Sequence, residues 1–298
     1  YALPVHDDMS VMVIQPQGWS VPTNEHGVAR FFYTHKPEGS ASALRFGGLP
    51  PTGPLPERID FPLSRQDGPD DAFRCAVIGD AQAYSNDEVG HFKDSALVDV
   101  LGMGLGAGDC MIYLGDVVGD DLDLLDRIMA LGGQVGVPQW FVFGNHDMDF
   151  DATTPADRAD TWRSKVMPDY YAFEIGKVLF VALNNIVYPC GEVDAQRPGR
   201  ERCVDSDRKA YNARVEDQQV RWLENLLALT PKDKRVVVMH HAPFVSFVDT
   251  ESAIHQTDNA GEIHALLAGR PALSLSGHTH SLENHDPGQS FEGWTVQT

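Results

Sequence analysis

From Phe73 onward, short runs of apolar residues alternate with segments of helical periodicity. The apolar runs contain few polar positions, which is typical of strands covered on both faces. We expect such strands in "FRCAVIGD", "CMIYLGD", "PQWFVFGNHD", "KRVVVMHH" and "PALSLSGHTH", and a strand pair in "YYAFEIGKVLFVALNN". Helices are expected in "DSALVDVLGMGL", "LDLLDRIMALGG", "EDQQVRWLENLLALT" and "AGEIHALLAG". This alternation predicts an α/β domain built around a buried sheet.

The first 66 residues have a different pattern. "SVMVIQP", "ARFFYTHKP" and "IDFPL" are short β-rich runs separated by Pro, Gly and Asn, without helical periodicity. They predict a small all-β N-terminal domain over residues 1–66, joined by an acidic linker to a second domain over residues 67–298.

Charge and hydropathy exclude two classes of partner. The chain carries 43 acidic and 23 basic side chains and a formal net charge of −20. Such a surface repels the backbone of duplex nucleic acid. No apolar run reaches the roughly 18 residues of a membrane span, so no membrane segment is expected. The oligomeric state cannot be inferred from the sequence.

Four cysteines bear on the cellular compartment. Cys75 and Cys110 lie inside apolar runs, and we expect them to be small buried residues. Cys190 and Cys203 bracket the polar segment "CGEVDAQRPGRERC", which predicts a disulfide and an exported, periplasmic or extracellular protein. The alternative is a pair of free loop thiols in a cytoplasmic protein.

Polar side chains follow the predicted strands at their C-terminal ends. They are Asp80, Asp116, Asn145, His240 and the pair His278 and His280. Loops converge at that edge of an α/β sheet, so these residues can meet although they are far apart in the chain. Glycine precedes four of the positions, as Gly79, Gly115, Gly144 and Gly277, and allows a sharp turn there. Each motif alone is weak, but their joint occurrence predicts one site.

The residue types indicate the chemistry of that site. Carboxylates, an amide oxygen and imidazoles without thiolates suit Mn, Fe(II), Zn or Mg. The candidate ligands are too many for one ion. Two metal ions that share a carboxylate form the arrangement that stabilises the attacking and leaving oxygens in phosphoryl transfer.

The five motifs "GDAQ", "GDVVGDD", "GNHD", "MHHAP" and "GHTH" resemble those of the calcineurin-like metallophosphoesterase superfamily. The phrases of the N-terminal region resemble its bacterial subgroup with a small β domain. The resemblance implies a four-layer α-β-β-α catalytic domain that hydrolyses phosphoesters with a hydroxide held by two metal ions. The chain stops soon after its last motif, so we expect that a C-terminal piece is missing.

The resemblance also implies roles for individual residues. One metal would be held by Asp80, Gln82, Asp116 and His280, and the other by Asp116, Asn145, His240 and His278. His240 is preferred over His241 because the first His of "MHHAP" matches the ligand position of the superfamily. His146 would face the phosphate, and Asp147 would orient its imidazole. Candidates for the substrate rim are Tyr84, Tyr188 and His241.

Gln82 departs from the usual Asp-x-His form of the first motif. One interpretation is a degraded site in a non-catalytic, metal-containing cell-surface binding protein. The other is an oxygen-rich site that favours Mn, with Fe, Zn and Mg as alternatives. We favour an active enzyme that cleaves phosphodiester or phosphomonoester bonds of small substrates. A phosphoprotein phosphatase is a further alternative.

Overall fold

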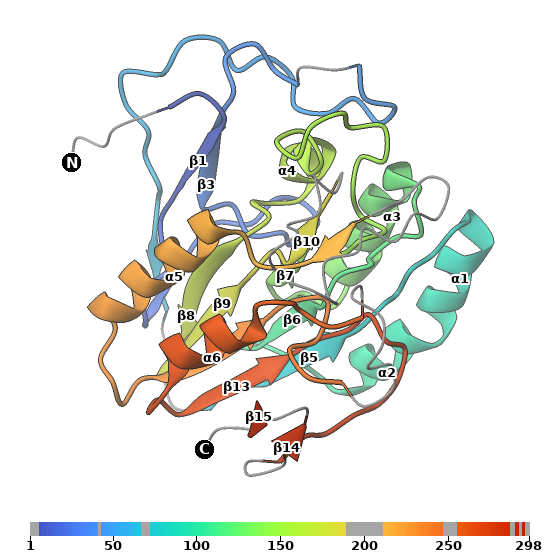
Figure 1. Ribbon diagram of the computed structural model, residues 1–298. Coiled ribbons are helices and arrows are strands. Elements are labelled where there is room, and N and C mark those ends of the chain that lie inside the picture. The colour runs from blue at the N-terminus through green and yellow to red at the C-terminus, as the bar shows by residue number, and fades with distance from the viewer. Residues whose placement is uncertain are drawn as a thin grey trace.

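The computed structural model describes residues 6–40, 43–66, 72–188, 211–246 and 255–286, and the backbone of two short strands, β14 (Ser290–Phe291) and β15 (Trp294–Thr295). Two sheets form its centre (Figure 1). The first has the parallel order β5-β6-β7, with bounds Cys75–Ile78, Cys110–Tyr113 and Gln139–Phe141. The second has the order β13-β12-β9-β8, with bounds Ala272–Leu275, Arg235–Met239, Val178–Ala182 and Tyr171–Ile175. Only β8 is antiparallel to its neighbour in these two sheets.

Helices lie on the outer side of each sheet (Figure 1). The first sheet is covered by α1 (Asn86–Asp94), α2 (Ala96–Gly102), the 3-10 turn η1 (Leu122–Leu124) and α3 (Leu125–Gly133). The second is covered by α5 (Asp217–Leu229) and α6 (Ala260–Leu267). The expected helices are therefore present, whereas α1 and the short α4 (Asp160–Lys165) were not predicted. None of the helices in the described residues is long and apolar enough to cross a membrane.

The alternation of side chains along β9 shows how the layers pack. Leu179 and Val181 join the apolar cluster formed with α5 and α6. Phe180 and Ala182 belong to the larger cluster between the two sheets. There the ring of Trp140 from β7 stacks on Phe173 of β8, with ring centroids 3.6 Å apart. The four-layer α-β-β-α sandwich expected from the sequence is thereby confirmed.

The N-terminal region is β-rich, as predicted, and packs against both sheets. Its strands are β1 (Met9–Met12), β2 (Trp19–Ser20), β3 (Phe32–His35) and β4 (Ser64–Arg65). Single bridges join Gln15 to Phe173 and Val28 to Gln139, at β8 and β7. "IDFPL" is not a strand, since β4 begins directly after it. The domain boundary at residue 66 stays a prediction.

A buried charge cluster fastens this region to α4. Lys36 Nζ lies 2.8 Å from Asp157 Oδ1 and 2.6 Å from Asp160 Oδ2. Ser40 donates a third hydrogen bond to Asp160, at 2.7 Å. The lysine shares its charge between two carboxylates that are otherwise shielded from water. Arg163 Nη1 lies farther away, 3.5 Å from Asp160 Oδ1. Removing the lysine would take the nearest positive charge from both carboxylates, which is destabilising.

The cysteine prediction was wrong for Cys75 and Cys110, which form a disulfide. They begin β5 and β6 and are direct partners in the parallel register, with their Cα atoms 4.5 Å apart. The sequence does not tell that these two strands are neighbours, so the pairing was not foreseen. Cys190 and Cys203 lie outside the described residues.

We expect the Cys75→Ala/Cys110→Ala variant to unfold more easily than the parent. The bond closes a loop with a sequence separation of 35, and a loop of that size restricts the unfolded chain by about 3–4 kcal/mol. Denaturant unfolding of both proteins measures the difference. Cys190→Ser/Cys203→Ser is the matched comparison, because it also removes two cysteines but leaves this cross-strand bond. Equal midpoints for the parent and the Ala variant would contradict the prediction.

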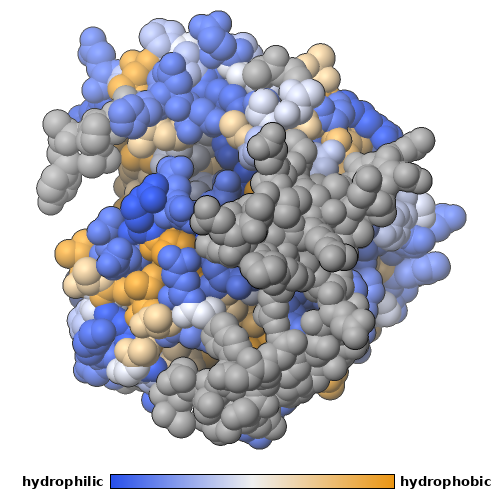
Figure 2. Space-filling model, in the orientation of Figure 1, coloured by the Kyte–Doolittle hydropathy of each residue, from blue (hydrophilic) through white to orange (hydrophobic). Residues whose placement is uncertain are grey.

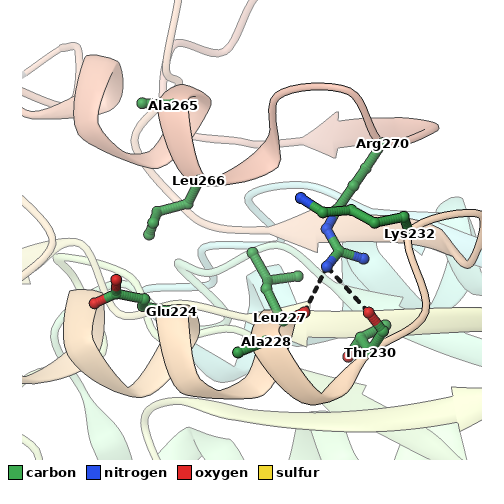
Figure 3. A pocket seen from close by; sticks show the side chains of 8 residues that line it. All are labelled: Glu224, Leu227, Ala228, Thr230, Lys232, Ala265, Leu266 and Arg270. Carbon is green, nitrogen blue, oxygen red and sulfur yellow. Dashed lines mark hydrogen bonds between the residues drawn. The ribbon is translucent and has the colours of Figure 1, made fainter.

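A hollow of about 310 Å³ opens between α5 and α6 (Figure 3). Arg270 donates hydrogen bonds there to the carbonyls of Leu227, Thr230 and Pro231, and so caps the end of α5. These residues precede β12 and β13. The hollow therefore lies at the N-terminal edge of the second sheet, opposite the strand ends that carry the candidate ligands. Figure 2 shows apolar residues among hydrophilic ones over these helices.

Candidate metal centre

The predicted ligands follow β5, β6, β7, β12 and β13, whose C-terminal ends meet at one edge of the sandwich. Within the second sheet Gly277 N donates to His241 O at 3.1 Å, and across the two sheets the backbone N–H of His278 after β13 donates to the carboxylate of Asp80 after β5. The loops hold unusual backbone conformations. Seven non-glycine residues in the described chain have positive φ, and six belong to these loops: Asp80, Gln82, Asp116, Asp120, His278 and His280. Strain of this kind concentrates at functional sites.

His241 stands at the centre of the cluster. Its Nδ1 lies 2.8 Å from the carbonyl oxygen of Leu114. A carbonyl only accepts, so Nδ1 carries a proton, and Nε2 is the nitrogen that presents a lone pair once a cation has displaced its own proton. That nitrogen lies 3.1 Å from Asp116 Oδ2, 3.0 Å from Asn145 Oδ1 and 3.1 Å from His278 Nδ1.

Several lone pairs thus converge with few protons between them. Donor atoms of Asp116, His241 and His278 all lie within 4.8 Å of one another. Both Asp116 and His241 are buried, so water cannot screen their charges. A cation satisfies such a set of oxygen and nitrogen donors, and the set suits a divalent metal. The residues present therefore fit a metal ion.

The pKa values of Asp116 and His241 are also shifted by the burial and closeness of these side chains. Burial opposes ionisation of Asp116, but His241 lowers the pKa of this carboxyl to about 2. Burial also disfavours the charged imidazole, but Asp116 and Asp80 raise the pKa of His241 to about 9. The negative field that holds a proton on this imidazole is the field that attracts a metal cation.

The preference for His240 over His241 is corrected by the structure. His240 Nδ1 donates to the carbonyl of Ala242 at 2.8 Å, and its Nε2 lies 2.6 Å from Ser274 Oγ. The ring stacks on Phe244, with centroids 3.7 Å apart. Burial lowers the pKa of His240 to about 3, so it is a neutral core residue. Successive residues after β12 point to opposite sides, and only His241 points into the cluster.

The remaining predicted ligands lie at the same edge. Asp80 accepts from the backbone N–H of His278 with both oxygens, at 3.0 and 2.9 Å. His280 Nε2 lies 3.5 Å from Asp80 Oδ1, on the exposed side. Gln82 donates its backbone N–H to Asp116 O at 2.8 Å, and its side-chain Nε2 lies 3.0 Å from Tyr84 Oη.

His146 lies beside this cluster, held at two points. Its backbone N–H donates to Asp116 Oδ1 at 2.8 Å. Its Nδ1 lies 2.6 Å from Asp120 Oδ1. Asp120 is therefore the carboxylate that orients the ring. The sequence analysis had not assigned it, although it lies only four positions after Asp116.

Asp147 does not orient His146, contrary to the prediction. Its carboxylate is turned inward and accepts from the backbone N–H groups of Val117, Val118 and Gly144, at 3.0–3.1 Å. It thereby fastens the loop after β6 to the loop after β7. Burial and the neighbouring Asp116 raise the pKa of Asp147 to about 7.

The three residues expected to line the rim of the substrate site lie in different surroundings. Tyr84 is half exposed, and its ring lies edge-on to His146 with centroids 5.9 Å apart. Tyr188 is buried and donates its hydroxyl to the carbonyl of Phe150, so it does not face an open rim. His241 belongs to the cluster itself. Tyr211, which the sequence analysis missed, places its hydroxyl 3.4 Å from His278 Nε2.

Three of the four glycines before the ligands are needed because another ligand packs against them. A Cβ on Gly115, whose φ is +90°, would overlap the imidazole of His241. A Cβ on Gly144 would overlap the backbone nitrogen and Oδ1 of Asp116. A Cβ on Gly277 would overlap Asp80 Oδ2. On Gly79, by contrast, the nearest atom would be Gly277 Cα at 3.9 Å, an ordinary contact.

We therefore expect Gly144→Ala and Gly277→Ala to lose activity on the order of 10²-fold, the effect of displacing a reacting group by about 1 Å. Gly79→Ala is the matched control, and it should keep most of the activity because its methyl group has room. Rates for a chromogenic phosphoester, with metal content per chain, provide the measurement. Equal losses in all three variants would show that close approach is not the cause.

The fold and the site define an α/β protein with a candidate metal centre at the shared strand ends. A profile of the calcineurin-like phosphoesterases matches residues 73–282, well over half of the chain. The chain belongs to this family. A search of the curated proteins finds no significant match.

Solved structures with detectable similarity include three with low identity. A dimetal phosphatase from Danio rerio is 17% identical, with a TM-score of 0.48 over 69% of this chain and 81% of its own. A protein of unknown function from Aquifex aeolicus is 14% identical, with a TM-score of 0.28 over 65% and 94%. The cold-active protein-tyrosine phosphatase of a psychrophilic Shewanella is 13% identical, with a TM-score of 0.21 over 51% and 53%.

Proposed function

We propose that this protein is a metal-dependent phosphohydrolase that acts on small phosphoesters with two divalent cations. The observation that carries the proposal is the convergence of Asp116, Asn145 and His278 on Nε2 of His241. Family membership supports phosphoester hydrolysis as the reaction.

The candidate ligands divide into two sets, one for each cation, and Asp116 would belong to both sets. One cation would be held by Asp80, Gln82, Asp116 and His280, and the other by Asp116, Asn145, His241 and His278. When bound, such a pair of cations polarises the phosphoryl group and lowers the pKa of the attacking water.

His146 would supply the proton that the leaving group needs. Asp120 holds the Nδ1 side of the ring, and Nε2 would face the leaving oxygen. As water oxygen bonds to phosphorus and the ester P–O bond breaks, Nε2 would donate its proton to the departing alkoxide. The carboxylate of Asp120 stabilises the charged imidazole before that transfer.

The charge around the cluster favours diesters over monoesters. Among the described residues, no Lys or Arg forms an ion pair or hydrogen bond with Asp80 or Asp116. A monoester dianion needs more compensating charge than a diester monoanion does. The net charge of −20 also disfavours polymeric nucleic acid as substrate.

Two further features support a proposal for the metal that this site prefers and for the cellular compartment of the protein. An amide oxygen at Gln82 is a harder ligand than imidazole, so we propose Mn as the preferred metal. The Cys75–Cys110 disulfide supports an oxidising compartment and thus an exported protein.

The test is hydrolysis of bis(p-nitrophenyl) phosphate and p-nitrophenyl phosphate by metal-stripped protein, with Mn, Mg, Zn or Fe added back. We expect Mn to restore turnover, with the diester preferred. Gln82→His should shift the preference from Mn toward Zn. Two bound ions without turnover for either substrate would favour the alternative, a metal-containing binding protein.

A further inference from the structure

Gln82 presents a problem that a histidine at this position would not. Its side chain ends in an oxygen and an NH₂ group, and only the oxygen can bind a metal. Asp80 and Asp116 carry acceptor oxygens in the same cluster and would attract the NH₂ group. Something must hold that group away from them.

The structure places the hydroxyl of Tyr84 at that point. Gln82 Nε2 donates to Tyr84 Oη at 3.0 Å. Ala83, between the two residues, forms a parallel bridge with Val118. Gln82 itself has a left-handed backbone, with a φ of 39°. The contact between the two side chains therefore depends on this local turn and not on the alternation of a regular strand.

Two contacts of Tyr84 and one of the preceding Ala83 hold the tyrosine in place. Its backbone N–H donates to Glu88 Oε2 at 2.6 Å. Gly119 donates its N–H to the carbonyl of Ala83 at 2.9 Å. The tyrosine ring packs so closely over Gly119 that a Cβ there would overlap it. A side chain held in this way can orient a neighbour.

We infer that Tyr84 is a positioning residue for Gln82: its hydroxyl accepts the amide N–H and so turns the amide oxygen toward the metal. The inference rests on the proposed function, because it takes Gln82 as a metal ligand. An imidazole at position 82 has no NH₂ group that competes for the carboxylates, so keeping such a group away from them is a role that the hydroxyl has only together with glutamine.

The test measures Mn(II) binding to the metal-stripped full chain by calorimetry for four proteins: the parent, Tyr84→Phe, Gln82→His and the double variant. Tyr84→Phe keeps the ring on Gly119 and removes only the hydroxyl. We expect it to weaken one of the two Mn sites about tenfold, the loss typical of a group that orients a ligand. In the Gln82→His background the same change should leave Mn affinity as it was.

The other outcomes separate this inference from the proposed function. An equal loss in both backgrounds, or no loss in either, overturns the role of Tyr84 while leaving the metal centre intact. Gln82→His with the affinities of the parent overturns Gln82 as a ligand, and this inference with it. A parent protein that binds no Mn overturns the proposed function itself.

Discussion

Replacing His146 by alanine is expected to lower kcat by about 10²–10⁴, the usual contribution of general acid–base catalysis. The substitution removes the imidazole held by Asp120 but keeps the backbone N–H that donates to Asp116 Oδ1 at 2.8 Å. Metal content should therefore remain at the parent level. Steady-state kinetics with the diester, together with metal analysis of the purified variant, measure both quantities.

His91→Ala is the matched control, because His91 is an exposed residue of α1. Its replacement should change neither kcat nor the metal content. Asp120→Asn extends the test, since it keeps the shape of the side chain but removes its charge. We expect a smaller fall in kcat than for His146→Ala. Unchanged kcat in His146→Ala at full metal content would exclude the imidazole from catalysis.

His241→Ala and His240→Ala are expected to have opposite consequences. His241→Ala removes the nitrogen on which Asp116, Asn145 and His278 converge. We expect loss of one cation per chain and a fall in activity on the order of 10³-fold, since the cation supplies several kcal/mol of transition-state stabilisation.

His240→Ala should instead keep both cations and lower stability. It removes a fully buried ring that stacks on Phe244, and deleting a buried side chain of this size costs about 2–5 kcal/mol. Metal analysis and denaturant unfolding of the two variants distinguish the roles. Loss of metal in His240→Ala with retention in His241→Ala would restore the original assignment from the sequence.

The sequence was sufficient to predict the strands and most of the helices, because hydrophobic periodicity depends only on residues that are close together in the chain. The central residues of "FRCAVIGD" and "KRVVVMHH" are apolar, and they became β5 and β12. The helix α5 follows the spacing of its apolar residues. The helix α1 was missed because its segment has only two buried residues, Val89 and Phe92.

The sequence could not decide which of two adjacent side chains enters the site. His240 and His241 are chemically identical neighbours, and the direction of the chain after β12 separates them. Asp120 and Asp147 present a related difficulty, since Asp147 is adjacent to His146 in the chain whereas Asp120 lies 26 positions before it. Only the path of the loops shows that Asp147 binds backbone N–H groups while Asp120 meets the imidazole.

The sequence by itself determined the family, the order of strands and helices, and the loops that carry the chemistry. These depend on residue types at short spacing, which a chain displays before it folds. The tertiary structure alone decided the pairing of Cys75 with Cys110, the choice of His241, and the contact between Tyr84 and Gln82. These depend on strand register and on side-chain direction, which are set when the layers pack together.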